Sequence, residues 1–249
     1  MSLIHKINRA ILGDYSEVGL NNLTDRQNWI KNQLQSIPAG LKILDAGAGE
    51  CQYKKYCSHL NYSSQDFNQY DGKGDGTGIQ NGEWDYSQID IVSDIINMPV
   101  SDASFDVVLC TEVLEHIPDP MAAIKEFSRV LKPGGKLIIT APFCSITHLA
   151  PYHFSTGFSK YFYEHWFQQN NIDLASIDYN GNYFEYLAQE IHYLKIASDK
   201  YASKVKRGFL SEIASRILLS HLKKLSKNGN SSNELLAYGL HVVGVKKNN

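Results

Sequence analysis

The stretch that decides the fold is KILDAGAGECQ, residues 42–52. It starts as a short apolar run, reaches an acid at Asp45, and then alternates glycines with small residues at Gly47 and Gly49. Glycine adopts backbone conformations closed to other residues and lets a ligand approach the main chain closely. A strand, a glycine turn and the start of a helix together form a common ligand-binding unit. The stretch therefore predicts a strand over 41–46, a binding turn, and a helix over about 50–58.

The spacing of the glycines narrows the class of ligand that the turn is expected to bind. The dinucleotide fingerprint G-x-G-x-x-G needs a third glycine for close packing of helix on strand. Here that position is Gln52, which weakens the interpretation as an NAD(P)-binding oxidoreductase. A plain tight turn without a ligand is the simplest alternative.

Strand-like and helix-like patterns alternate along the rest of the chain, which predicts a parallel sheet covered by helices. After 41–46, we expect strands at 62–67, 89–94, 105–110, 136–142, 172–179 and 236–247. We expect helices after Pro120 up to LKPGG (131–135), over 159–170, and over a long region from 183 to 225. We predict one domain over 1–249. It comprises an N-terminal helical cap (1–38), a ligand-binding core (41–142), a loop with a long helical insertion at the same edge of the sheet as the binding turn (143–235), and the last strand (236–247).

Polar side chains follow three successive predicted strands. Asp66 ends the second strand, Asp94 ends the third, and CTEVLEHI (110–117) follows the fourth. Open α/β sheets bind their ligands in the crevice outside the carboxyl ends of the strands. An acid in the position of Asp66 can accept hydrogen bonds from both hydroxyls of a ribose, and Asp94 can reach an adenine amino group.

Taken together, LDAGAGEC, Asp66, DIVSDIINMPVSDASFDVVLCTEVLEHI and VLKPGGKLIITAP resemble the class I S-adenosylmethionine-dependent methyltransferases, over roughly residues 41–142. The resemblance implies an α/β, Rossmann-like fold: a seven-stranded, mostly parallel sheet with helices on both faces and an antiparallel last strand beside the fifth. It also implies S-adenosyl-L-methionine as cofactor, whose lack of a pyrophosphate accounts for the missing third glycine. The residues that it places around the cofactor are Asp45, Gly47, Ala48, Gly49, Asp66, Phe67, Asp94, Ile95, Thr111 and Glu112.

Three histidines are the candidate catalytic residues. His116 follows the fourth strand, and His148 and His153 lie in the loop after the fifth strand, at the same edge of the predicted sheet. Imidazole titrates near neutral pH and suits a general base that activates a hydroxyl acceptor. A purely structural role is the alternative for each of them.

A metal-assisted mechanism is a second possibility. Glu112-x-x-Glu115-His116 resembles a divalent-metal site of small-RNA 2′-O-methyltransferases and some quinone O-methyltransferases, which a further histidine would complete. Two carboxylates and an imidazole suit Mg²⁺ or Mn²⁺, or Zn²⁺ with fewer ligands. Because the EVLEH sequence is also compatible with metal-free relatives, we assign no metal ligand from the sequence.

The substrate expected is a small molecule methylated on a hydroxyl or amine, with a sugar or sugar-linked metabolite as the first choice. The alternatives are a metal-assisted RNA or quinone O-methyltransferase built on Glu112, Glu115 and His116, and a catalytically inactive cofactor-binding module. We expect Tyr152, His153 and Tyr161 to contribute to the acceptor pocket. Glycine-rich residues 68–84, with Trp84, are expected to form a flap beside the cofactor.

Composition and charge limit the classes of partner that the protein can have. The net charge is −2 and gives no reason to expect DNA, although residues 195–227 form an amphipathic, basic segment. We expect that segment to pack on the domain or on a second subunit in a homodimer. The alternative is that it attracts phosphates or an anionic membrane surface. The four cysteines show no metal or disulfide spacing, and no apolar run reaches about 18 residues. We therefore expect a soluble cytoplasmic protein without integral membrane contact.

Overall fold

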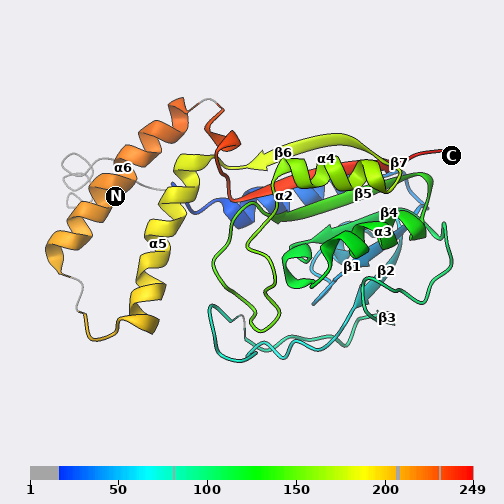
Figure 1. Ribbon diagram of the computed structural model, residues 1–249, viewed down its shortest axis with the longest axis horizontal. Helices are drawn as coiled ribbons and strands as arrows, with labels where there is room; N and C mark the ends of the chain where they lie inside the picture. The colour runs from blue at the N-terminus through cyan, green and yellow to red at the C-terminus, as the bar shows by residue number, and fades with distance from the viewer. Residues whose placement is uncertain (1–16, 81, 206–207, 230, 249) are drawn as a thin grey trace. The chain divides into compact units, whose positions relative to one another are not determined.

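The computed structural model describes residues 17–80, 82–205, 208–229 and 231–248 (Figure 1). Of the predicted N-terminal cap, residues 1–16 lie outside the described residues, and helix α2 (Asn22–Gln35) forms within the remainder. None of the helices in the described part of the chain combines the length and apolar character that a membrane crossing requires.

In the described part of the chain, one seven-stranded sheet forms, in the order β3-β2-β1-β4-β5-β7-β6. Strands β1 to β5 pair in parallel, while β7 runs antiparallel to β5 over the seven residue pairs from Lys136↔Val245 to Pro142↔Gly239. The predicted sheet, with its last strand antiparallel beside the fifth, is confirmed. The strands are β1 (Lys42–Ala46), β2 (Asn61–Asp66), β3 (Ile91–Val92), β4 (Phe105–Thr111), β5 (Leu131–Pro142), β6 (Ile172–Asn180) and β7 (Gly239–Lys246).

Apolar side chains fill both faces of the sheet, because central parallel strands are covered on both sides. On one face, Ile43 of β1 and Leu109 of β4 pack with Ile30 and Leu34 of α2. The other face is covered by α3 (Pro120–Val130) and α4 (Lys160–Gln169) (Figure 1). Helix α3 starts where the sequence predicts, since Asp119 caps it by accepting a hydrogen bond from the Ala122 amide.

The helix predicted over 50–58 does not form. Turns follow Gly49, and only the three-residue 3₁₀ helix η1 (Lys54–Tyr56) appears. Gly49 and Cys51 have φ angles of 51° and 56°, in the left-handed region, which a right-handed helix cannot include. The binding turn is therefore a compact loop and not the N-terminus of a helix.

Three other boundaries differ from the prediction. Helix α3 ends at Val130, and LKPGG forms the irregular start of β5, where the pairing register shifts between Phe105 and Val107. The third strand is reduced to two residues. The predicted helix over 183–225 is two helices, α5 (Tyr183–Tyr201) and α6 (Phe209–Asn228).

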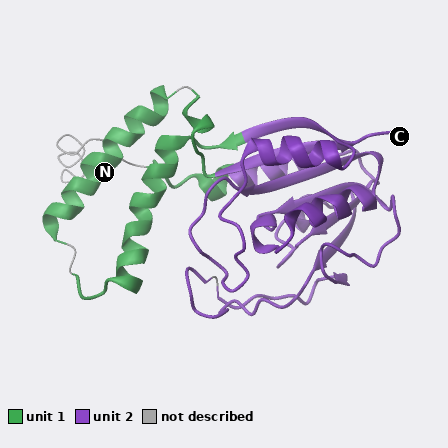
Figure 2. Ribbon diagram, in the orientation of Figure 1, with its two compact units in different colours: residues 1–25, 179–238 green, residues 26–178, 239–249 purple. Residues whose placement is uncertain are grey.

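The chain divides into two compact units, coloured separately in Figure 2. Unit 1 comprises residues 1–25 and 179–238, and unit 2 comprises residues 26–178 and 239–249. Within unit 1, α5 and α6 pack together around Ala188, Leu219 and Leu222, while large apolar side chains such as Phe209 are 79% exposed. The organisation as one methyltransferase domain stays a prediction.

The sheet core yields a stability prediction. Val108 of β4 is completely buried, whereas Val92 of β3 is 59% exposed. We expect Val108→Ala to lower the free energy of unfolding by about 2 kcal/mol, through lost burial of two methyl groups and a small residual cavity. Val92→Ala, the same change in the same sheet, is expected to cost only a few tenths of a kcal/mol. Urea unfolding measures both, and equal losses would contradict this account of the core.

Candidate functional site

A cavity of about 710 Å³ opens at the carboxyl ends of β1, β2 and β4, entirely within unit 2. Its size falls in the range of pockets that bind small organic ligands. It brings together nine of the ten residues that the sequence predicts around a cofactor: Gly47, Ala48, Gly49, Asp66, Phe67, Asp94, Ile95, Thr111 and Glu112.

The glycine turn after β1 is anchored to the end of β2. The amides of Gly47 and Ala48 both donate to the Gln65 carbonyl oxygen, at 2.8 and 2.9 Å. Gly47 has a φ of 74°, and a Cβ placed there would lie 2.5 Å from a methyl group of Val113. A glycine is therefore needed on both conformational and steric grounds.

Asp66 is bound to the turn at the floor of the cavity. Its Oδ2 accepts from the Gly49 amide at 2.9 Å, and its Oδ1 accepts from the Asn68 amide at 2.9 Å. Burial raises the pKa of Asp66, while these backbone hydrogen bonds act to lower it. Each carboxylate oxygen has more than one lone pair, so both remain able to accept a further hydrogen bond from a ligand.

Aromatic side chains of the glycine-rich segment 68–84 and its continuation cover the turn. The Trp84 ring lies so close that a Cβ on Gly49 would be 2.7 Å from it. Tyr70 contacts Trp84 edge-on at 5.5 Å between ring centroids, and Tyr86 lies 5.9 Å from Trp84. All three line the cavity, which is the placement expected of the predicted flap.

Asp45 is the predicted cofactor residue that does not line the cavity. Its carboxyl group is buried, and its Oδ2 accepts from the Tyr62 hydroxyl at 2.7 Å. Burial raises the pKa of Asp45 to about 7. In this position Asp45 supports the turn from below and does not face the cavity.

Glu112 is held at the cavity edge by a residue that the sequence analysis missed. The Arg26 guanidinium of α2 donates to Glu112 Oε2 at 2.7 Å, and both residues line the cavity. Glu112 also has a φ of 54°, a strained conformation of the kind that concentrates at functional sites. No sequence signal identified Arg26, because a single arginine on a predicted helix carries no spacing information.

The three candidate catalytic histidines come together. His116 belongs to the 3₁₀ helix η2 (Leu114–His116), and the loop after β5 supplies His148 and His153. One nitrogen of each ring lies within 4.8 Å of the other two. His116 and His148 line the cavity, whereas His153 is not among the lining residues.

Two of the three histidines are weak bases in this environment. Burial and the neighbouring His148 lower the pKa of His116 to about 3, and burial also lowers the pKa of His153. Glu115 lies beside them, completely buried, and burial with the charge of Glu112 raises its pKa well above the usual range. His116 and His153 are therefore neutral near pH 7 and offer lone pairs.

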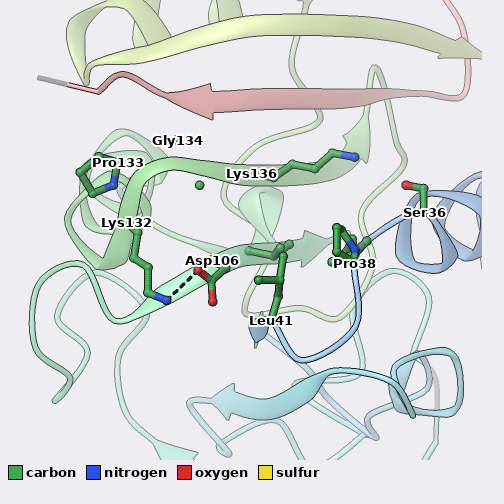
Figure 3. Close-up of a pocket in the computed structure, with 11 residues that line it drawn as sticks. Ser36, Pro38, Leu41, Asp106, Lys132, Pro133, Gly134 and Lys136 are labelled. Carbon is green, nitrogen blue, oxygen red and sulfur yellow. Dashed lines mark hydrogen bonds and ion pairs between the residues drawn. The ribbon is translucent and has the colours of Figure 1, made fainter.

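A second, smaller cavity of about 280 Å³ lies at the opposite ends of the strands, as Figure 3 shows. Two of its charged residues are paired: Lys132 Nζ contacts Asp106 Oδ1 at 2.6 Å. None of the predicted site residues lies there. Since open α/β sheets bind ligands at the carboxyl ends, the larger cavity is the candidate site.

Comparison with known proteins agrees with this placement. Residues 44–139 match the family model described as a methyltransferase domain. A ubiquinone biosynthesis O-methyltransferase of Pseudomonas aeruginosa is 31% identical over 131 residues, which is 46% of this chain and 49% of that protein. The chain spans about half, or less, of the length of the curated relatives it matches.

Two solved structures show the breadth of the fold. Phosphoethanolamine N-methyltransferase 2 of Haemonchus contortus, in complex with S-adenosyl-L-methionine, aligns with a TM-score of 0.51 and 13% identity, covering 99% of this chain and 60% of that one. The [4+2]-cyclase SpnF aligns with a TM-score of 0.53 and 16% identity, covering 90% and 80%. Residues 44–139 are thus similar to a methyltransferase domain, and the chain shares the Rossmann-like fold of these solved structures.

The glycine turn gives a testable prediction. We expect Gly47→Ala to lower the free energy of unfolding by about 2–4 kcal/mol, through its positive φ and its clash with Val113. Gly40→Ala is a matched control, because Gly40 also has a positive φ of 82° but has nothing near its missing Cβ. It should cost about 1 kcal/mol. Urea unfolding compares the two, and Val113→Ala combined with Gly47→Ala should recover the difference.

Asp45 gives a pH-dependent prediction. Folded protein retains the Asp45 proton up to about pH 7, whereas the unfolded chain releases it near its ordinary pKa of 3.8. Between these values the unfolded state binds fewer protons, so stability falls as pH rises, and the loss is complete above about pH 7.

Asp45→Asn removes this ionisation while keeping an oxygen for Tyr62. Its stability relative to the unsubstituted protein should therefore be greater at pH 8 than at pH 5, by about 2–3 kcal/mol. Urea unfolding without added ligand measures it. The same difference at both pH values would show that Asp45 does not hold its proton.

Proposed function

We propose that the protein transfers the methyl group of S-adenosyl-L-methionine to a hydroxyl of a small molecule. The observation that carries the proposal is the cavity at the carboxyl ends of β1, β2 and β4, where the glycine turn and Asp66 lie together. The match of residues 44–139 to a methyltransferase domain supports it independently.

The residues present fit this cofactor. Gly47 and Gly49 line the cavity, and the close approach of Val113 and Trp84 excludes a side chain at either position. In the proposed binding mode, Asp66 accepts hydrogen bonds from the ribose hydroxyls. Asp94, Ile95 and Phe67 surround the adenine, and Thr111 and Glu112 lie toward the methionine end.

When bound, the cofactor supplies a methyl group already activated by a positively charged sulfur. What the protein must add is alignment of the acceptor, and orientation of this kind contributes up to roughly 7–11 kcal/mol. Tyr152, Phe154 and His116 line the remaining wall of the cavity and are the residues proposed to position the acceptor. Tyr152 packs edge-on against Phe67 at 5.0 Å, which joins the two parts of the pocket.

A hydroxyl acceptor is favoured over an amine by the name of the curated relative, a ubiquinone biosynthesis O-methyltransferase. The sugar or sugar-linked acceptor expected from the sequence has no support among the comparisons and stays a prediction. The fold alone leaves transfer open, because SpnF is a cyclase with the same architecture. An assay for a methylated product therefore distinguishes an active methyltransferase from an inactive cofactor-binding module.

Binding of the demethylated cofactor tests the first half of the proposal. We expect S-adenosylhomocysteine to bind and Asp66→Asn to weaken the binding about 10- to 100-fold, since it replaces a charged acceptor of hydrogen bonds. Asp102→Asn is the control, because Asp102 is an exposed residue whose carboxylate pairs with Arg129 outside the cavity. Isothermal titration calorimetry measures all three proteins, with NADH as a parallel titrant.

Two results would contradict the assignment. One is NADH binding that exceeds binding of S-adenosylhomocysteine, and the other is identical affinity in the Asp66 and Asp102 variants. Cofactor binding without any methylated phenol or quinol product would instead favour the inactive module.

A further inference from the structure

We propose that the end of the hairpin formed by α5 and α6 binds the surface of an anionic lipid bilayer. The hairpin end is defined by six exposed apolar residues and the three lysines next to them in the chain: Leu194, Tyr201, Val205, Phe209, Leu210, Ile217, Lys195, Lys200 and Lys204. All of them belong to unit 1, drawn in green in Figure 2. The large cavity lies within unit 2, so the hairpin end shares no residue with the proposed methyl-transfer site.

Large apolar side chains are exposed where the two helices are joined. Helix α5 ends at Tyr201, and helix α6 begins at Phe209. Phe209 and Leu210 are each 79% exposed, Val205 is 71% exposed and Tyr201 is 67% exposed. Single exposed apolar residues are ordinary, but a group of large ones gathered at one place indicates a surface that binds an apolar partner.

These side chains face away from the contact between the two helices, which pack together around Ala188. On α5, Leu194 and Tyr201 lie seven residues apart, which is about two helical turns, so they share one face. Leu210 and Ile217 have the same spacing on α6. All four side chains are more than half exposed. Each helix therefore carries an apolar stripe that no other element of the described chain covers.

Positive charge accompanies the exposed apolar residues. Residues 195–227 contain nine Lys or Arg and two Asp or Glu, a net charge of +7, whereas the whole chain has a net charge of −2. Lys195, Lys200 and Lys204 each adjoin an apolar residue of the hairpin end, and Lys200 Nζ lies 5.4 Å from the centre of the Tyr201 ring. The apolar stem of a lysine can lie in a membrane while its ammonium group stays among the headgroups.

An anionic bilayer fits both features better than a protein or a nucleic acid does. Lysine is depleted from protein–protein interfaces, because burial against another protein removes water from its ammonium group. A nucleic acid would pair its phosphates with the lysines but leave Leu210 and Ile217 in water. At a bilayer surface, apolar side chains enter the boundary of the acyl chains while lysines meet the anionic headgroups. The hairpin end is therefore assigned to an anionic lipid surface.

The test is binding of the full chain to lipid vesicles, measured by co-sedimentation without cofactor. One set of vesicles contains phosphatidylcholine and phosphatidylglycerol in equal parts, and the other contains phosphatidylcholine alone. We expect much stronger binding to the anionic vesicles. This binding should weaken as salt is added, because salt screens the attraction between exposed charges.

Two double variants separate the charged and apolar contributions. Lys195→Gln with Lys204→Gln should weaken binding to the anionic vesicles about 10- to 30-fold, since each lysine near such a surface contributes about fivefold. Phe209→Ala with Leu210→Ala should weaken it at least about tenfold, because less apolar surface leaves water. All four side chains are exposed, so these changes leave the packing of α5 on α6 intact.

A fluorescence measurement distinguishes insertion into the bilayer from adsorption on its surface. Phe209→Trp places an indole at the hairpin end, whereas the natural residues Trp29, Trp84 and Trp166 all lie in unit 2. With brominated lipid in the anionic vesicles, we expect quenching in this variant to exceed that of the unsubstituted protein. Equal quenching in the two proteins would show that Phe209 does not enter the bilayer and would overturn the proposal.

Matched control variants lie outside the hairpin end. Leu235→Ala removes an apolar side chain of unit 1 that is 71% exposed, and Lys55→Gln with Lys125→Gln removes two exposed lysines of unit 2. Both controls should keep the affinity for anionic vesicles within about twofold, because charges away from the contact are screened. Circular dichroism establishes that every variant is folded.

Three results would overturn the assignment to a lipid surface. The first is equal binding to both sets of vesicles, or binding to neither. The second is an equal loss of binding in the hairpin-end variants and the controls. The third is a dimer, seen by light scattering, that Phe209→Ala with Leu210→Ala dissociates in a protein that binds no vesicles. That result would assign the surface to a second copy of the chain, and binding of RNA without binding of vesicles would assign it to a nucleic acid.

Discussion

The large cavity depends on one set of short hydrogen bonds, those that tie the glycine turn after β1 to the end of β2. Amides of Gly47 and Ala48 bind the Gln65 carbonyl, and the Gly49 amide binds the Asp66 carboxylate. They bend the chain sharply away from β1 without a helix. The bare backbone, the acid at the end of β2 and the covering Trp84 ring all take their positions from this link.

Much of this arrangement could be predicted because it follows from strong local signals. Apolar runs ending in polar residues mark parallel strands, and the carboxyl ends of such strands share one edge, so the residues around Asp66, Asp94 and Thr111 had to converge. The late, apolar residues 239–246 indicated an extra strand, while its place beside β5 came from the resemblance to class I methyltransferases. The other features depend on residue type and chain order alone.

Other features depend on geometry that residue type does not reveal. Residues 50–58 carry no proline, yet left-handed conformations at Gly49 and Cys51 prevent a helix. The Arg26–Glu112 ion pair joins residues 86 positions apart, and nothing in either segment marks it. The sequence also could not show that Glu112 pairs with Arg26 while Glu115 lies beside His116 and His148. The left-handed φ of 54° at Glu112 interrupts the regular helix that would place the two acids on one face.

The position of β7 has a consequence for how the protein folds during synthesis. Strand β7 lies between β5 and β6, so β6 has no neighbour in the sheet until residues 239–246 leave the ribosome. The whole stretch from 181 to 238, including α5 and α6, is made before that strand. The edge of β5 stays open for the same interval, and unpaired strand edges recruit other chains. Completion of the sheet is therefore a late, non-local step, of the kind that slows folding.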